Sequence, residues 1–294
     1  MNLPPVYLVD ASVYIFRAWF SMPDDFVNRA GEPTNAVYGF SGFLCSLLEQ
    51  TGAEHIAIAF DESLAVSYRN EIYPEYKANR EPAPEELKRQ FGWARAVAEA
   101  LGLRCYADGR YEADDLIGTL AEYWRERGHP ICIVTADKDL AQLVGEGDHW
   151  WDFSRNRKLN ARQLTEKFGV MPEQMADFLA LTGDPVDNIP GVPGIGPKSA
   201  AALLGHFGDL DNLYRRLDEV PTLPLRGAKS VHRKLDDHRE AAQLARRLTG
   251  IETAVESALS APETTRAEVD IERLNRLFDE LNFGGMLRQR CLRL

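Results

Sequence analysis

Short apolar segments that end in or near an acidic residue recur in the first half of the chain. Residues 6–10, 55–61 and 130–137 read VYLVD, HIAIAFD and PICIVTAD. Each segment is rich in β-branched residues and too short for a typical helix, which is typical of a buried strand. A helical pattern follows each of them. This alternation predicts a mostly parallel sheet that is flanked by helices on both faces.

Helical periodicity is clearest where apolar residues recur every three or four positions. It covers 85–101, where it stops before a glycine, and 116–128. After residue 170 the strand signal disappears and helical periods remain. We therefore predict an α/β domain over 1–170 and a helical domain over 171–294, in which 271–281 forms a last amphipathic helix.

Composition is typical of a soluble globular protein, because 45% of the 294 residues are hydrophobic and 27% are charged. The formal net charge of −11 excludes binding to nucleic acid through bulk positive charge. Residues 194–250 are an exception, since they hold ten basic and seven acidic side chains. A polyanionic partner would therefore be bound locally by the helical part.

The spacing of the cysteines and histidines indicates neither a zinc site nor a disulfide framework. The four cysteines and six histidines show neither the pairs of a zinc site nor those of a disulfide framework. The chain starts without a basic region before a long apolar stretch, and we find no apolar window of membrane-spanning length. These features predict a cytoplasmic protein without a membrane partner.

Acidic residues gather where the predicted sheet would present a ligand site. Asp10, Asp61 and Asp137 follow three strands, and the carboxyl ends of parallel strands meet at one edge. The other candidates lie at a helix start and in two turns: Glu112, Asp114, Asp115, Asp139, Asp184 and Asp187. Helix capping alone would explain Asp115 or Asp139, but not the density of acids. So many carboxylates repel one another unless cations neutralise them, which favours Mg²⁺.

Two further segments suit contact with a phosphate backbone. Residues 189–199 read IPGVPGIGPKS before an apolar helix, so amide groups at the helix start and Lys198 can face a phosphate. Residues 62–90 interleave aromatic and basic side chains, which suits a single strand, although five bases there face six acids. A plain glycine-proline turn and a solvated surface loop are the alternatives.

Six motifs in order resemble those of the 5′-nuclease family of flap endonucleases, and most of all the 5′-to-3′ exonuclease domain of bacterial DNA polymerase I. They are LVDAS (8–12), AFDES (59–63), YPEYKANR (73–80), YEADDLIGTLA (111–121), TADKDLAQLV (135–144) and LTGDPVDNIPGVPGIGPKSAAALL (181–204). Together they span nearly the whole chain. The resemblance implies a PIN-like catalytic domain and a helical domain with a helix-hairpin-helix DNA clamp at 189–204.

The resemblance also implies a set of site residues around two Mg²⁺ ions, for which Mn²⁺ is an alternative. The first ion would be surrounded by Asp10, Asp61, Glu112 and Asp114, and the second by Asp115, Asp137, Asp139, Asp184 and Asp187.

The catalytic residues that the resemblance implies are Lys77, Arg80 and Asp115, with the two basic residues at the foot of a helical arch near 62–95. Tyr76 would be a stacking platform for a base. Other DNA contacts would come from Gly191, Gly194, Ile195, Gly196, Lys198 and Ser199. Backbone carbonyls of Leu181, Thr182, Pro190, Val192 and Ile195 would hold a K⁺ ion.

The implied activity is metal-dependent 5′-to-3′ exonuclease or flap-endonuclease cleavage of DNA near a single-strand/duplex junction, giving 5′-phosphate and 3′-hydroxyl ends. We expect a monomer that acts on 5′ flaps, overhangs or nicks, RNA primer ends included, as either a separate protein or a fragment of a polymerase. Two alternatives stay open at this stage. A haloacid-dehalogenase-like phosphatase would need a second acid two residues after Asp10, where Ser12 stands. A silent binder of branched DNA would tolerate loss of the carboxylates.

Overall fold

A single sheet forms the centre of the larger domain. The computed structural model describes residues 3–23, 25–62 and 67–294. Its strands are β1 (Val6–Asp10), β2 (His55–Asp61), β3 (Arg104–Asp108), β4 (Ile131–Val134), β5 (His149–Asp152) and β6 (Arg157–Leu159). They lie in the order β3-β2-β1-β4-β5-β6, and all neighbours pair in parallel except β5 with β6. The predicted mostly parallel sheet is confirmed.

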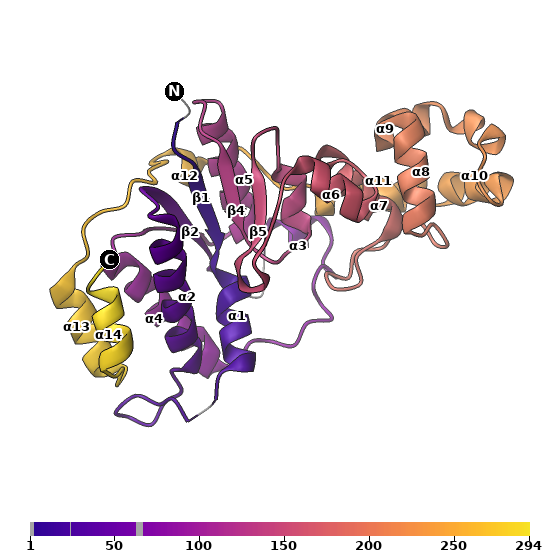
Figure 1. Ribbon diagram of the computed structural model, residues 1–294. Coiled ribbons are helices and arrows are strands. Elements are labelled where there is room, and N and C mark those ends of the chain that lie inside the picture. Colours follow the sequence, from indigo (N-terminus) through magenta and orange to yellow (C-terminus); the bar gives the residue numbers. More distant parts are fainter. Residues whose placement is uncertain (1–2, 24, 63–66) are drawn as a thin grey trace.

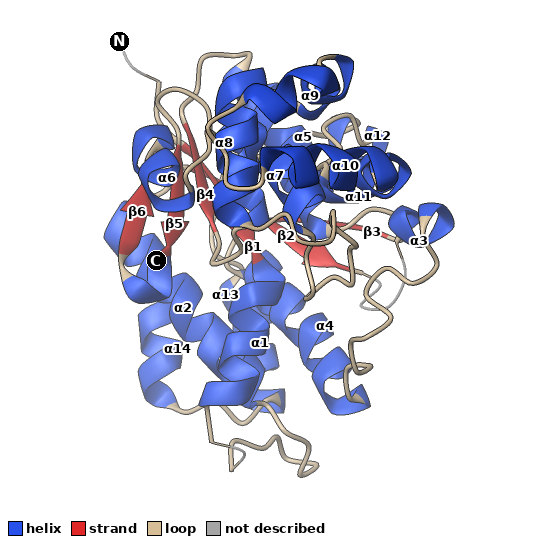
Figure 2. Ribbon diagram, turned by 90° about the vertical axis from the view of Figure 1, so that its right-hand side faces the viewer, coloured by secondary structure: helices blue, strands red, loops and turns tan. Residues whose placement is uncertain are grey.

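Side chains that alternate along the central strands supply two separate cores. Val9 and Ile58 face the helices α1 (Ala11–Ser21), α2 (Asn35–Thr51) and α4 (Glu85–Ala100). Leu8 and Ala57 face the opposite side, where α5 (Ala113–Arg125), α6 (Ala161–Phe168) and α12 (Glu256–Leu259) lie. Because both faces are covered, the strands are apolar without interruption, as the sequence predicted. Figure 2 shows the helices on either side of the strands.

A second group of helices has its own core. It consists of α7 (Met175–Thr182), α8 (Pro197–Phe207), α9 (Leu210–Arg215), α10 (Ala228–Asp237) and α11 (Arg239–Thr249). Short 3₁₀ segments precede α7, at Pro172–Gln174, and connect α9 to α10, at Leu217–Thr222. The buried side chains of this group form one cluster around Leu203 and Leu204. In Figure 1 this group projects to the right of the sheet.

The end of the chain lies on the α/β domain, which differs from the predicted extent of the helical domain over 171–294. After α11 the backbone returns to the sheet, where the amide of Ile56 donates to the carbonyl of Thr264 over 2.7 Å. The helices α13 (Ile271–Glu280) and α14 (Gly285–Cys291) then pack on α4 and α2 (Figure 1). Leu274 and Phe278 are fully buried in the core of the α/β domain. The predicted helix at 271–281 exists, but it does not belong to the helical domain.

The segment predicted as a helical arch is also different from the expectation. Residues 63–66 lie outside the described residues. The short α3 (Tyr68–Ile72) is followed by turns over 73–84 that extend to α4. Leu87 of α4 is buried in the α/β core. The second half of the predicted arch is therefore a core helix, because its apolar positions pack against α1 and α2.

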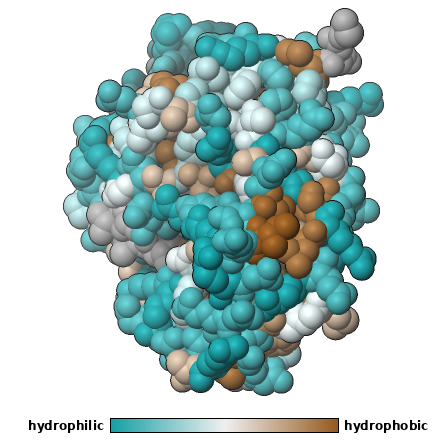
Figure 3. Space-filling view, turned by 90° about the vertical axis from the view of Figure 1, so that its left-hand side faces the viewer, coloured by the Kyte–Doolittle hydropathy of each residue, from teal (hydrophilic) through white to brown (hydrophobic). Residues whose placement is uncertain are grey.

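The surface beside the two last helices is mostly polar. Figure 3 views the molecule from the side of α13 and α14 and shows a compact hydrophobic area, with smaller ones elsewhere, among mostly hydrophilic side chains. Across the described ranges, no helix combines the length and the apolar character that a membrane span requires.

Candidate active site

Two of the predicted aspartates lie at or just after the ends of adjacent central strands. Asp10 closes β1 and caps α1, because its carboxylate accepts the amide of Val13 over 3.4 Å and the hydroxyl of Thr135 over 2.9 Å. Asp137 follows β4 by three residues. Since β1 and β4 are adjacent and parallel, both carboxylates lie at the same edge of the sheet.

Asp61 closes β2 and fixes the elements on either side of it. Its carboxylate accepts the hydroxyl of Ser12 over 2.6 Å and the amide of Ala113 over 2.9 Å. These bonds tie the starts of α1 and α5 to the end of β2. At the start of α5, Asp114 lies near Asp10 and Asp137, whereas the Glu112 carboxylate contacts the segment 69–77.

Burial and mutual repulsion raise the pKa values of the first group of carboxylates. Burial, together with the charges of Asp61 and Asp137, raises the pKa of Asp10 to about 7. The pKa of Asp114 is raised well above its ordinary value by burial and by Asp137, Asp10 and Glu112. Isolated capping residues would not show this pattern, because their nearest charges would not be other carboxylates.

A second group joins the first through Asp137. Asp139 begins a 3₁₀ turn at Asp139–Leu143, and Asp184 and Asp187 follow α7. Burial raises the pKa of Asp139 to about 7, and Asp137, Asp184 and Asp187 add to the increase. The structure therefore brings together eight of the predicted acids: Asp10, Asp61, Glu112, Asp114, Asp137, Asp139, Asp184 and Asp187.

Basic side chains neutralise this edge at three points. Lys77 Nζ lies 2.6 Å from Glu112 Oε1, and the guanidinium of Arg80 pairs with Asp187. Lys138, between two of the predicted acids in sequence, lies 2.6 Å from Asp184 Oδ2. The sequence predicted Lys77 and Arg80 beside the site, but it did not assign a role to Lys138.

The carboxylate oxygens of this edge are suitable ligands for hard divalent ions, but they are not arranged as a preformed metal site. In residues 3–23, 25–62 and 67–294, no three acidic, histidine or cysteine side chains are arranged closely enough to hold a metal ion. The atom Asp139 Oδ1 is nevertheless buried without a hydrogen bond, and Lys138 Nζ is 3.2 Å away. Carboxylate oxygens are the ligands that Mg²⁺ and Mn²⁺ prefer. An ion would therefore fit this edge if it replaced the basic partners.

Asp115 does not join this group, which differs from the prediction that it is a metal ligand and a catalytic residue. Its side chain is fully buried and forms two parallel bonds of 2.8 Å with the guanidinium of Arg69. The reason is helix geometry, since adjacent residues at the start of α5 point in different directions. Asp114 faces the carboxylates, whereas Asp115 faces α3.

Tyr76 is also placed differently from the prediction. Only 4% of this residue is exposed, and its ring belongs to the core of the helical domain. Its hydroxyl lies 3.0 Å from Glu112 Oε2 and 3.2 Å from Asp187 Oδ2. The burial of the ring differs from the exposed stacking platform that the sequence predicted, and the hydroxyl group is the part of Tyr76 that contacts the carboxylates.

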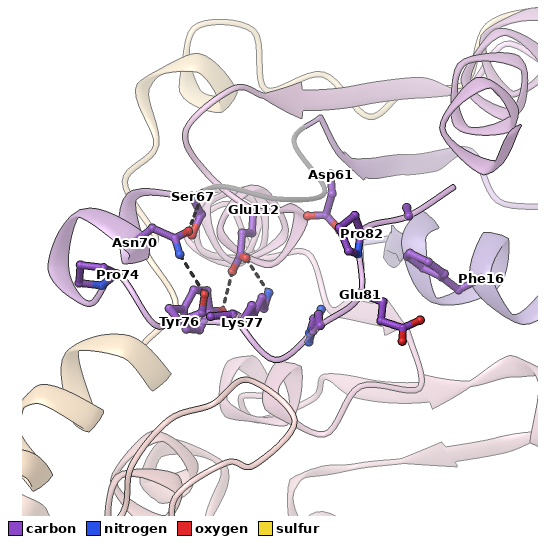
Figure 4. A pocket seen from close by; sticks show the side chains of 13 residues that line it. Phe16, Asp61, Ser67, Asn70, Pro74, Tyr76, Lys77, Glu81, Pro82 and Glu112 are labelled. Carbon is purple, nitrogen blue, oxygen red and sulfur yellow. Dashed lines mark hydrogen bonds and ion pairs between the residues drawn. The ribbon is translucent and has the colours of Figure 1, made fainter. Parts of the chain in front are cut away.

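A cavity of about 680 Å³ opens beside the carboxylates. Asp61, Glu112, Lys77 and Arg80 line it, and Phe16 of α1 lies on the opposite wall (Figure 4). Sequence reasoning did not identify Phe16. Its position six residues after Asp10, near the middle of the first helix, is a signal that could have indicated it.

The glycine hairpin lies next to this site. Asp184 and Ile189 pair across its base, and Gly183 has a left-handed φ of 75°. A side chain at Gly191 would collide with the backbone of Gly183, so the two segments can cross only through glycine. At the start of α8, Gly194, Gly196 and Lys198 are exposed, Ser199 is half-buried, and Ile195 is buried. Ile195 can therefore offer only its backbone to a ligand.

The carbonyls predicted to hold K⁺ come from both sides of this hairpin. Those of Leu181 and Val192 already accept the amides of Val192 and Ile195, over 2.9 and 3.0 Å. Each carbonyl oxygen has a second lone pair, so these bonds leave it one acceptor position.

Comparison with known proteins identifies the class. Residues 5–169 match the family model described as the 5′-3′ exonuclease N-terminal resolvase-like domain, and residues 170–272 match the 5′-3′ exonuclease C-terminal SAM fold. The chain is 42% identical over 288 residues to DNA polymerase I of Pseudomonas aeruginosa, covering 98% of this chain and 31% of that protein. It is 33% identical over 281 residues to a 5′-3′ exonuclease of Buchnera aphidicola, covering 95% and 97% of the two chains. The chain thus spans about a third of the length of the DNA polymerase I relatives.

Solved structures share the fold. The T5 5′-exonuclease with bound zinc superposes with a TM-score of 0.69 at 21% identity, covering 94% of this chain and 99% of the other. The catalytic core of Rad2 in complex with DNA substrate gives 0.64 at 17% identity, covering 99% and 92%.

The fold and the family matches define a nuclease that acts from 5′ ends. The chain belongs to the 5′-3′ exonuclease family, to which its sequence motifs had indicated a resemblance. The haloacid-dehalogenase-like alternative is wrong, because the family matches cover both domains.

Proposed function

We propose that this protein is a structure-specific 5′-to-3′ exonuclease and 5′-flap endonuclease that uses two divalent metal ions. The observation that carries the proposal is the convergence of eight carboxylates beside a cavity lined by Lys77 and Arg80. Asp10, Asp61, Glu112 and Asp114 would hold one ion, and Asp137, Asp139, Asp184 and Asp187 the other. The ions, Mg²⁺ or Mn²⁺, would lower the pKa of an attacking water and neutralise charge on the phosphate.

The basic residues would change partners when substrate binds. Lys77 and Arg80 now pair with Glu112 and Asp187, the same carboxylates that the ions would occupy. Once these carboxylates are neutralised by ions, both cations are free to bind the phosphate at the cleavage point. Metal binding would therefore strengthen DNA binding at the site. Tyr76 would keep Glu112 and Asp187 oriented through its hydroxyl group.

The helical domain would hold the duplex by its backbone. Amides at the exposed start of α8, with Lys198, suit a phosphate, and K⁺ at the hairpin carbonyls would add a further contact. These contacts read no base. The affinity would thus depend on salt more than on sequence. The duplex end would lie at the cavity, where the free 5′ strand enters.

The proposal extends to substrates and setting. Flaps, overhangs and nicked duplexes all offer a 5′ strand next to a duplex, and an RNA primer end has the same backbone. Hydrolysis would leave 5′-phosphate and 3′-hydroxyl ends, as suits replication and repair. We also propose that the protein acts as a monomer in the cytoplasm.

Cleavage of a 5′-end-labelled flap duplex tests this function. In Mg²⁺ the unmodified protein should cut near the junction, whereas EDTA or Asp114→Asn should abolish the cuts. Asp211→Asn is the matched control, because Asp211 is an exposed acid of α9 outside the site. Flap binding without cleavage in Mg²⁺ would contradict the proposal and favour the silent DNA binder.

A further inference from the structure

Arg69 is a buried cation with all five of its N–H donors in hydrogen bonds. It is 2% exposed. Nη1 donates to Asp115 over 2.8 Å and to Glu112 over 3.0 Å. Nη2 donates to Asp115 and to the carbonyl of Gly250, both over 2.8 Å, and Nε donates to the carbonyl of Leu248 over 2.9 Å. A guanidinium has five donors, so no further contact is open to this side chain.

Asp115 is saturated in the same way. Besides the two bonds from Arg69, its carboxylate accepts the amide of Glu112 over 3.1 Å and the amide of Glu252 over 2.9 Å. Four bonds fill the four lone-pair positions of a carboxylate. A metal ion at Asp115 would have to break one of these bonds and leave a buried charge without its full set of partners, which is costly.

The pair connects three parts of the chain that are far apart in sequence. Arg69 belongs to α3, and Asp115 belongs to the first turn of α5. The accepting carbonyls and the amide of Glu252 lie where the chain leaves the helical domain and returns to the sheet. Through Arg69 Nη1 the pair also reaches Glu112, a carboxylate of the metal site.

We propose that Arg69 and Asp115 are a positioning pair, and that Asp115 does not ligate a metal ion. The pair holds the Glu112 carboxylate in place and fixes the duplex-binding domain against the cleavage site. The two adjacent aspartates of α5 therefore have different roles, because Asp114 faces the ions and Asp115 faces Arg69. This inference rests on the proposed two-ion function.

The test compares four variants at the start of α5 and in α3: Arg69→Gln, Asp115→Asn, the two together, and Asp114→Asn. Asp115→Asn leaves the buried Arg69 guanidinium with Glu112 as its remaining carboxylate partner, so this variant could fail to fold. The double variant Arg69→Gln with Asp115→Asn removes both charges of the pair, so neither is left buried alone. This double variant is therefore the decisive one. Asp114→Asn is the matched control on the same helical turn. Calorimetric titration with Ca²⁺ counts bound ions, steady-state cleavage of a flap duplex in Mg²⁺ gives kcat and KM, and thermal melting confirms folding.

We expect the double variant to bind two Ca²⁺ ions, as the unmodified protein does. Its kcat should fall about 10- to 100-fold, which is usual for residues that orient metal ligands. Its KM should stay within about threefold, since the hairpin is untouched. Arg69→Gln alone should lower kcat to a similar extent, since the two residues act as one unit. Asp114→Asn should weaken ion binding.

Three results would contradict parts of this account, and they can be told apart. Loss of one bound ion in the double variant, but not in Arg69→Gln, would make Asp115 a ligand and overturn the inference. An unchanged kcat in the double variant would overturn the positioning role. If the unmodified, folded protein binds no ion, the proposed function itself fails.

Discussion

At the scale of single residues, the acidic side chains of the site form ion pairs with lysine and arginine side chains of the same chain. Lys138 shows this most clearly, because its ammonium lies between Asp139 and Asp184, at 3.2 and 2.6 Å. Its side chain is 42% exposed, so it can move aside into solvent. The same position cannot hold both an ammonium and a divalent ion. Under the proposed function, Lys138 would therefore compete with the second ion.

Replacement of Lys138 should strengthen ion binding. We expect Lys138→Gln to raise the affinity for Ca²⁺ at the second position about tenfold, equivalent to about 1.4 kcal/mol, as measured by calorimetric titration. Lys88→Gln is the control, since Lys88 is 46% exposed and lies 2.6 Å from Glu85, away from the site. Equal affinities in the two variants would show that Lys138 does not compete.

The raised pKa values predict how pH changes stability. Because the pKa values of Asp10 and Asp139 are raised to about 7, the folded protein binds more protons than the unfolded chain between about pH 4 and 7. Without metal, the melting temperature should fall as pH rises through this range. Divalent ions favour the ionised carboxylates, so Mg²⁺ should raise the melting temperature by several degrees more at pH 8 than at pH 5. Each kcal/mol of added unfolding free energy corresponds to a rise of about 2–4 °C. Thermal melts in EDTA and in Mg²⁺ measure both effects. A melting temperature that rises with pH in EDTA would contradict this prediction.

At the scale of elements, the hairpin between α7 and α8 depends on close backbone contact. A methyl group at Gly191 would collide with the backbone of Gly183, which cannot move as a side chain can. We expect Gly191→Ala to weaken binding of a nicked duplex at least tenfold, measured by fluorescence anisotropy in Ca²⁺. Gly205→Ala in α8 is the matched control, because nothing lies within 4 Å of its added Cβ. Unchanged binding in Gly191→Ala would remove the hairpin from the DNA interface.

The limits of sequence reasoning differ from element to element. The strand ends were predictable, because an apolar run followed by an acid is a local pattern, and it placed Asp10 and Asp61 correctly. The pairing of Arg69 with Asp115 was not, since 46 residues separate the two side chains. Tyr76 stands among basic and polar neighbours, which suggested exposure, yet the helical domain covers its ring. Local patterns indicate which residues form an element, whereas burial depends on what packs on it later.

At the scale of the whole molecule, α13 completes the α/β core. Phe278 is fully buried there, so Phe278→Ala should destabilise the α/β domain by about 3–5 kcal/mol. All five tryptophans of the chain lie before residue 152, so tryptophan fluorescence during urea unfolding reports on this domain. Ile271→Ala is the control, because Ile271 is in the same helix and 52% exposed. An unchanged tryptophan transition in Phe278→Ala would mean that α13 contributes nothing to the core.

The amphipathic pattern of 271–281 predicted a helix but not its partner, because an apolar face can pack on any complementary surface. Its assignment to the helical domain followed from order along the chain. The return of the backbone to β2 is a long-range event that no local spacing indicates.

That return also means that the helical domain is an insertion, joined to the sheet by two crossings of the chain instead of one. A domain on a single linker can swivel, but a domain on two, with Arg69 bonded at the second crossing, keeps its distance from the strand ends. Under the proposed function, the fold would set a fixed distance between the duplex-binding surface and the cleavage site. The number of nucleotides between the grip on the duplex and the cut would be a property of the fold, the same for every DNA sequence.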